Sequence, residues 1–157
     1  MSREPRRVTA ATRRAREMMM GGLVAGHAVG IGIIGLALAL GGADAALTAA
    51  LGFAAVVIFY SIGQALEVVA SELDPVQGLG LVLVSYAVRI VGIAAGLWGI
   101  LGHPAVAPHV ADVWLLLSVA GTVLAWVTGV VFVASRQHVP VYDTEYVPPA
   151  SSDDAPR

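Results

Sequence analysis

The feature that most constrains this sequence is a stretch of 118 residues, 18–135, that holds only six charged side chains. They are Asp44, Glu67, Glu72, Asp74, Arg89 and Asp112. The remaining 14 of the chain's 20 charges lie in the two short flanking segments. Because a soluble domain has about a quarter of its residues charged, this stretch suits a bilayer, and it leaves no room for a separate soluble catalytic domain.

The uncharged stretch divides into four apolar runs, each long enough to cross about 30 Å of hydrocarbon. The runs are 18–40, 45–70, 78–101 and 113–134, and the connections between them are rich in Gly, Pro and Asp, which favour turns. We predict an all-α integral membrane protein with four transmembrane helices in an up-down bundle. The membrane domain covers 18–135, between a disordered basic tail at 1–17 and a disordered tail at 136–157.

Arginines before the first run predict the orientation. Six lie in the first 16 residues, whereas the outer connections 41–44 and 102–112 have none. The positive-inside rule therefore places both tails in the cytoplasm. The chain has nine arginines, no lysine and 27 alanines, which suggests a GC-rich coding sequence. We expect a multi-pass protein of the bacterial inner (plasma) membrane.

Two alternatives concern the start of the chain. Ala43-Asp44-Ala45 imitates a signal-peptide cleavage site, but the preceding apolar run of 23 residues is longer than the roughly 7 to 15 of a signal peptide. Met1 and the run Met18-Met19-Met20 are both candidate start positions, and the second would remove the basic tail.

Glycines recur every four residues in the first run, at Gly22, Gly26 and Gly30. This spacing places three residues without side chains on one face of a helix, which permits close approach of another helix in a bilayer. We predict a packing surface there. Its partner is another helix of this chain, the favoured case, or a helix of a different protein, and the motif does not select a function.

Arg89 is the most costly residue in the membrane domain, because an arginine at the centre of a span costs roughly 2.5 to 3.5 kcal/mol. Side chains on a helix lean toward its N-terminus. The second and third runs are antiparallel, so Gln64 and Glu67 lean toward Arg89 while Arg89 leans toward them. We predict a polar cluster of Arg89, Gln64 and Glu67 in the cytoplasmic half. It is either a structural link between two helices, an ion pathway, or a docking site for a partner's polar residue.

Glu67, Glu72 and Asp74 bring three carboxylates within eight residues, and such oxygens suit a hard cation such as Mg²⁺. We regard them as weak candidates for a metal site, since a solvated polar turn is the favoured explanation. The sequence has no catalytic triad, phosphate-binding loop or nucleotide-binding motif. We expect no enzyme activity and no cofactor. The basic tail predicts contact with anionic lipids rather than with nucleic acid.

Short motifs carry a resemblance to a known family. Ser61-Ile62-Gly63-Gln64, the polar turn with Pro75, the segment 86–90 around Arg89, and Val139-Pro140-Val141-Tyr142-Asp143 together resemble the ATP synthase protein I family in its high-GC Gram-positive form. Arg89 would match the family's arginine or lysine in the third span. The resemblance implies an accessory protein for assembly or stability of the rotor ring of the F-type ATP synthase, and a magnesium-transport role has also been proposed for the family.

From these observations we expect an accessory membrane protein that contacts rotor subunits through helix packing. The alternative is a small cation transporter or channel, with magnesium a candidate ion, whose pathway includes Arg89 and Glu67. An enzyme of lipid metabolism is a third alternative and lacks a catalytic constellation. Expected partners are membrane lipids and rotor subunits, and self-association of the chain is a further possibility.

The topology gives the first testable prediction. A reporter fused after residue 106, in the second outer connection, should report the outer side of the membrane, and fusions at either tail should report the cytoplasm. Cytoplasmic reporter activity from the fusion at residue 106 would contradict the four-span topology.

Overall fold

The structure is a computed structural model that describes residues 10–137, and these residues form an all-α fold with no β-strand. Helix α1 spans Ala10–Ala70, α2 spans Pro75–Leu101, and α3 spans Asp112–Arg136. A 3-10 helix, η1, covers Ala107–His109 between α2 and α3. The all-α prediction is confirmed for this part of the chain. Most of both predicted tails, 1–9 and 138–157, lies outside the described residues.

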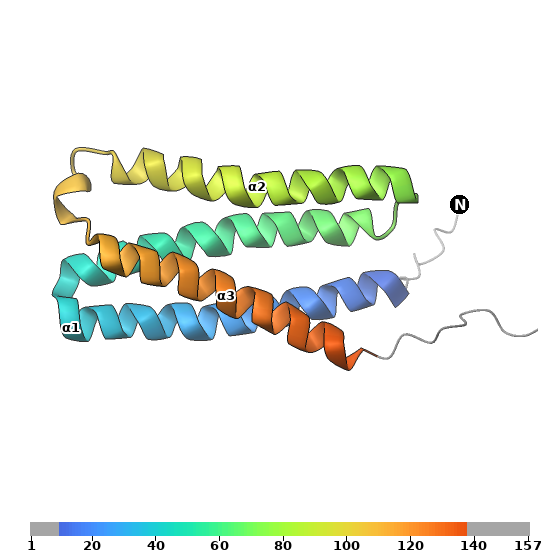
Figure 1. Ribbon diagram of the computed structural model, residues 1–157, viewed down its shortest axis with the longest axis horizontal. Helices are drawn as coiled ribbons and strands as arrows, with labels where there is room; N and C mark the ends of the chain where they lie inside the picture. The colour runs from blue at the N-terminus through green and yellow to red at the C-terminus, as the bar shows by residue number, and fades with distance from the viewer. Residues whose placement is uncertain (1–9, 138–157) are drawn as a thin grey trace, which may run out of the picture.

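Helix α1 folds back on itself at Gly42, the one residue within it whose backbone is not helical, with φ 78° and ψ −165°. We name 10–41 the first arm and 43–70 the second arm. The arms lie side by side and antiparallel (Figure 1). Thr12 Oγ1 donates to Glu72 Oε1 at 2.9 Å, although 60 residues of straight helix would span about 90 Å. Glycine suits this position because a positive φ strains residues with a Cβ.

The predicted count of four separate helices is not confirmed, since residues 10–137 form three α-helices. The difference lies at the predicted turn 41–44, where a single residue makes the reversal and helical backbone continues on both sides. Helix α1 also begins at Ala10, earlier than the predicted Met18. Residues 10–17 are mostly Ala, Arg and Glu, which are strong helix formers, and contain no Gly or Pro.

Helix α2 begins where Asp74 caps it. The Asp74 carboxylate accepts from the backbone N–H groups of Val76 and Gln77, both at 3.1 Å, and Pro75 occupies the first helical turn. An N-cap aspartate satisfies donors that have no partner within the helix, and proline loses nothing at this position. The polar turn predicted between the second and third runs is therefore short, and α2 starts three residues before the predicted 78.

Helix α3 crosses both arms of α1. Near its start, Ser118 Oγ donates to the Ala49 carbonyl of the second arm at 2.6 Å. Farther along, a Cβ added to Gly22 would lie 2.5 Å from Trp126 Nε1, and one on Gly26 would lie 2.9 Å from Trp126 Cε3. A Cβ on Gly30 would collide with the ring of Phe53 in the second arm. All three glycines of the predicted stripe thus face helices of this chain.

Helix α2 packs on the second arm of α1 and has no comparable contact with α3. The ring of Phe59 fills the space left by Gly92 and Gly96, where added Cβ atoms would meet it. Because α2 has a helix partner on one side only, most of its large apolar side chains, from Val76 to Ile100, are exposed.

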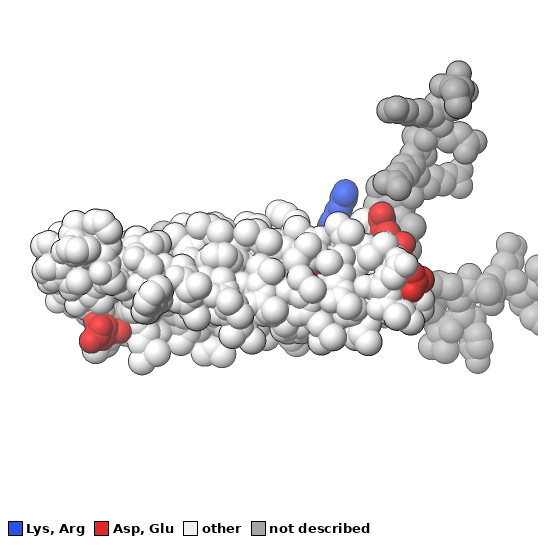
Figure 2. Space-filling model, turned by 90° about the horizontal axis from the view of Figure 1, so that it is seen from above, with Lys and Arg blue, Asp and Glu red and all other residues white. Residues whose placement is uncertain are grey.

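The distribution of polar and apolar side chains between interior and surface is the reverse of that in a soluble protein. Buried side chains include polar ones, namely Thr12, Thr48, Gln64, Ser85, Arg89, Ser118 and Thr122, while many Leu, Ile and Val side chains are exposed. Figure 2 shows a face whose charged side chains gather toward the ends and leave a long uncharged surface between them. In the described residues, α1, α2 and α3 are each long and apolar enough to cross a membrane. These features indicate a membrane protein.

The glycine contacts give a second prediction. Gly26→Leu forces a side chain against Trp126 and should lower the free energy of unfolding by about 1 to 3 kcal/mol, the typical cost of overpacking. Gly35→Leu is the matched control, because a Cβ on Gly35 meets nothing within 4 Å and should change stability little. Both are measured by unfolding the purified chain in mixed detergent micelles. Equal losses in the two variants would contradict the proposed packing.

Candidate functional site

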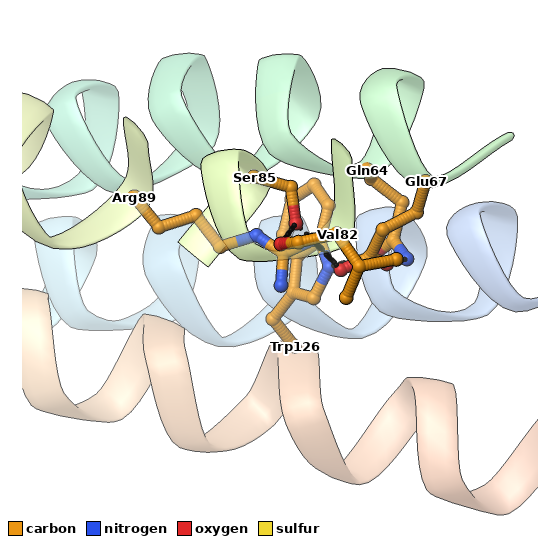
Figure 3. Close-up of polar contacts among 6 residues, drawn as sticks. All are labelled: Gln64, Glu67, Val82, Ser85, Arg89 and Trp126. Carbon is orange, nitrogen blue, oxygen red and sulfur yellow. Dashed lines mark hydrogen bonds and ion pairs between the residues drawn. The ribbon is translucent and has the colours of Figure 1, made fainter. Parts of the chain in front are cut away.

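Polar side chains from all three helices meet at one place in the apolar bundle. We name Gln64 and Glu67 of α1, Ser85 and Arg89 of α2, and Trp126 of α3 the polar cluster (Figure 3). The cluster lies toward the end of the second arm, close to the turn that leads into α2. Because these side chains have no water in a bilayer, each needs a partner within the protein.

An ion pair between Glu67 and Arg89 joins α1 to α2. Arg89 Nη2 donates to Glu67 Oε1 at 2.8 Å, and the two side chains are 10% and 23% exposed. Ser85 Oγ lies 3.0 Å from the same carboxylate oxygen and 2.7 Å from the Val82 carbonyl, so its single proton serves one acceptor at a time. The pair cancels both charges where either one alone would be costly.

Gln64 extends the cluster to α3. Its amide Nε2 donates to Glu67 Oε2 at 2.8 Å, and its Oε1 accepts from Trp126 Nε1 at 3.1 Å. The indole N–H can only donate and the carboxylate of Glu67 can only accept, which fixes the orientation of the Gln64 amide between them. A continuous chain of polar contacts therefore runs from α3 through α1 to α2.

Two tyrosines flank the guanidinium of Arg89. Its Cζ lies 5.2 Å from the ring centroid of Tyr60 and 5.3 Å from that of Tyr86, within the range of cation–π attraction. Arg89 is 9% exposed, and its Nε is a buried donor with no hydrogen-bond partner. The guanidinium thus has one hydrogen bond to the carboxylate and cation–π contact with two rings, while its buried Nε donor has no acceptor.

Gly63 makes room for the arginine. A Cβ at this position would lie 2.5 Å from Arg89 Nε, 2.9 Å from Arg89 Cγ and 3.1 Å from the Ser85 carbonyl oxygen. The absence of a side chain on Gly63 therefore allows Arg89 to cross the second arm and reach Glu67, one helical turn farther along. This explains why glycine precedes Gln64 in the segment Ser61-Ile62-Gly63-Gln64.

The polar cluster borders two hollows. A groove of about 380 Å³, which we name the α2–α3 groove, has Tyr60, Tyr86 and Arg89 in its lining together with Ile90 and the valines of α3. A second hollow of about 440 Å³ lies toward the start of α1, with Arg14 and Met18 among its residues. Gln64 and Glu67 line both. The cluster is therefore accessible from two sides.

The structure brings Arg89, Gln64 and Glu67 together, as their opposed lean suggested. Sequence reasoning omitted Ser85, Trp126 and the two tyrosines. Helical spacing carries a signal for some of them, since Ser85 lies four residues before Arg89 and Tyr60 lies four before Gln64, each on the same helix face. Trp126 has no such signal, because its place depends on how α3 crosses α1.

The weak metal candidates are not assembled into one site. Glu67 pairs with Arg89, Glu72 accepts from Thr12, and Asp74 caps α2. Within residues 10–137, no group of three or more His, Cys, Asp or Glu side chains is placed to hold a metal ion.

No family model, curated protein or solved structure matches this chain. What the polar cluster can do therefore has to be inferred from its chemistry. It can hold a carboxylate and a guanidinium as a neutral pair, and through Gln64, Glu67 and Arg89 it presents polar groups to a ligand that enters the α2–α3 groove. Both properties favour a binding role for the polar cluster.

The ion pair gives a third prediction. Arg89→Leu and Glu67→Leu should each destabilise the chain, because each leaves a buried charge unpaired, whereas the double variant should lose less than the sum. We expect a coupling energy of roughly 1 to 3 kcal/mol, measured as a double-mutant cycle of unfolding in mixed micelles. Strict additivity of the two single changes would show that the residues do not stabilise each other.

Proposed function

We propose that this chain is a four-span protein of the bacterial plasma membrane that binds a transmembrane helix of another protein. The two arms of α1, α2 and α3 supply the spans, and both ends of the chain face the cytoplasm. Support for the topology comes from the reversal at Gly42, which makes the arms antiparallel, and from the arginines before the first apolar run.

The observation that carries the binding proposal is the α2–α3 groove, whose largely apolar lining includes the polar side chains of Gln64, Glu67 and Arg89. Polar groups at membrane depth are costly unless they find partners. A helix that entered the groove with a carboxylate or a carbonyl oxygen at this depth would meet Arg89 in the lining. The tyrosine rings and the valines of α3 would provide the apolar contacts around it.

The resemblance to the ATP synthase protein I family suggests the identity of that helix. A rotor subunit of an F-type ATP synthase carries an isolated carboxylate in mid-membrane, which is an acceptor that Arg89 could recognise. We therefore propose that the protein is an accessory factor that holds rotor subunits during assembly or stabilisation of the ring. The interaction is one of packing and hydrogen bonding.

The cation-transport alternative has less support. Glu67, the ionisable residue of the suggested pathway, is already paired with Arg89. A second polar group, in which Asp44 Oδ2 lies 3.2 Å from His109 Nδ1, is found at the opposite end of the bundle beside the Gly42 reversal. The buried polar side chains of α3 between the two groups, Ser118 and Thr122, are hydroxyls that carry no charge.

A groove-filling variant tests the proposed function. Ile90 lines the α2–α3 groove and Val91 does not, although both are well exposed, at 70% and 63%. Ile90→Trp should reduce co-purification of rotor subunits with this chain about tenfold, as expected for a loss of 1 to 2 kcal/mol in packing. Val91→Trp adds the same bulk outside the groove and should leave co-purification unchanged.

A second variant tests the hydrogen bond. Arg89→Lys keeps a positive charge for Glu67 but removes the planar guanidinium and its further N–H donors, so the chain should stay folded and retain fewer rotor subunits. Normal ring yield after deletion of the whole gene, under every growth condition including low magnesium, would refute the assembly role. Loss of magnesium uptake with normal rings would favour the transporter.

A further inference from the structure

A second groove lies on another face of the bundle, between the first arm of α1 and α3. We name it the basic groove; its volume is about 890 Å³. Met20, Val24 and Ala28 of the first arm and Phe132 and Val133 of α3 line it. It forms where the backbones touch, since a Cβ on Gly129 would collide with the Gly21 carbonyl oxygen. The polar cluster lies elsewhere and shares none of its lining residues.

The mouth of the basic groove is positively charged. Arg13 and Arg16 belong to its lining, and both are exposed. The Cζ atom of Arg136 lies 4.2 Å from the ring centroid of Phe132, another lining residue. Glu17, the one acidic residue in the lining, lies 3.9 Å from Arg13 as an exposed pair, and among the described residues Arg16 and Arg136 have no carboxylate partner. The mouth therefore attracts an anion of one or two charges.

The length of the groove matches one leaflet of a bilayer. From Arg16 to Ala28 the helix rises about 18 Å at 1.5 Å per residue, and half of a typical hydrocarbon core is about 15 Å. Charged residues lie at one end of this length, and the apolar residues follow along it. An amphiphile with an anionic head and a hydrocarbon chain fits both parts at once.

We propose that the basic groove binds an anionic glycerophospholipid. The phosphate lies among Arg13, Arg16 and Arg136, since guanidinium groups bind phosphate oxygens through charge-assisted hydrogen bonds. One acyl chain follows the groove past Met20 and Val24 to Ala28. The lipid covers the seam between the first arm and α3 and so links the start of α1 to the end of α3.

Thermal unfolding of the purified full chain in detergent micelles tests this proposal. Dioleoyl phosphatidylglycerol, added in increasing amounts, should raise the unfolding midpoint, and dioleoyl phosphatidylcholine with the same acyl chains should raise it less. The double variant Arg13→Gln/Arg16→Gln should weaken the apparent affinity for phosphatidylglycerol roughly 30-fold, as expected for two basic contacts. Equal midpoints with the two lipids would overturn the proposal.

Two further variants separate the groove from general charge attraction. Arg14→Gln removes the same charge from the neighbouring hollow rather than from the basic groove, and it should leave the affinity close to that of the unchanged chain. Ala28→Trp fills the far end of the groove and should reduce the effect of the lipid while all arginines remain. Equal losses in Arg14→Gln and in the double variant would show nonspecific attraction and overturn the proposal.

Two other outcomes would also count against the lipid. If inorganic phosphate raises the midpoint as much as phosphatidylglycerol does, the mouth is an anion site without an acyl chain. If Ala28→Trp converts a dimer to a monomer in light scattering, a second copy of the chain occupies the groove.

Discussion

The ion pair between Glu67 and Arg89 is the interaction on which the position of α2 depends. Among the described residues, α2 packs on α1 and has no comparable contact with α3, and in lipid no hydrophobic effect drives two apolar helices together. What remains is the ion pair, the insertion of Phe59 between Gly92 and Gly96, and the passage of Arg89 across Gly63. The first contact requires a paired charge, and the other two require glycine at the point of contact. These requirements make the register of α2 against α1 specific.

The packing of α3 on α1 has a different physical basis. It depends on small residues that let backbones approach, with Trp126 covering Gly22 and Gly26 and its indole N–H bound to Gln64. Trp126 therefore belongs to both systems, the packing of α3 and the polar chain that ends at Arg89. A change in the crossing of α3 over the first arm would move the indole and disturb the donor that orients the Gln64 amide.

The all-α membrane fold and the meeting of three polar residues could be predicted from the sequence. The cost of burying a charge and the lean of side chains toward a helix N-terminus both follow from the sequence of each helix alone. An unpaired Arg89 within the membrane is energetically too costly. Because the second and third apolar runs are antiparallel, the side chains of its partners lean toward it. The one-residue reversal at Gly42 was not predictable, since Gly41-Gly42-Ala43-Asp44 fits a longer turn equally well. Trp126 was missed because its partner Gln64 lies 62 residues away, and only the crossing of α3 brings them together.

The one-residue reversal at Gly42 determines which part of the chain forms the surface at that end of the bundle. A turn of one residue leaves almost no chain outside the arms, so at that end of the bundle the segment 102–111 between α2 and α3 forms most of the non-helical surface. This segment contains Pro104 and Pro108, and η1 gives part of it a fixed shape. An antibody against that end would find its epitope there, in a segment held against the second arm, where Thr48 Oγ1 accepts from the Ala111 N–H at 3.1 Å.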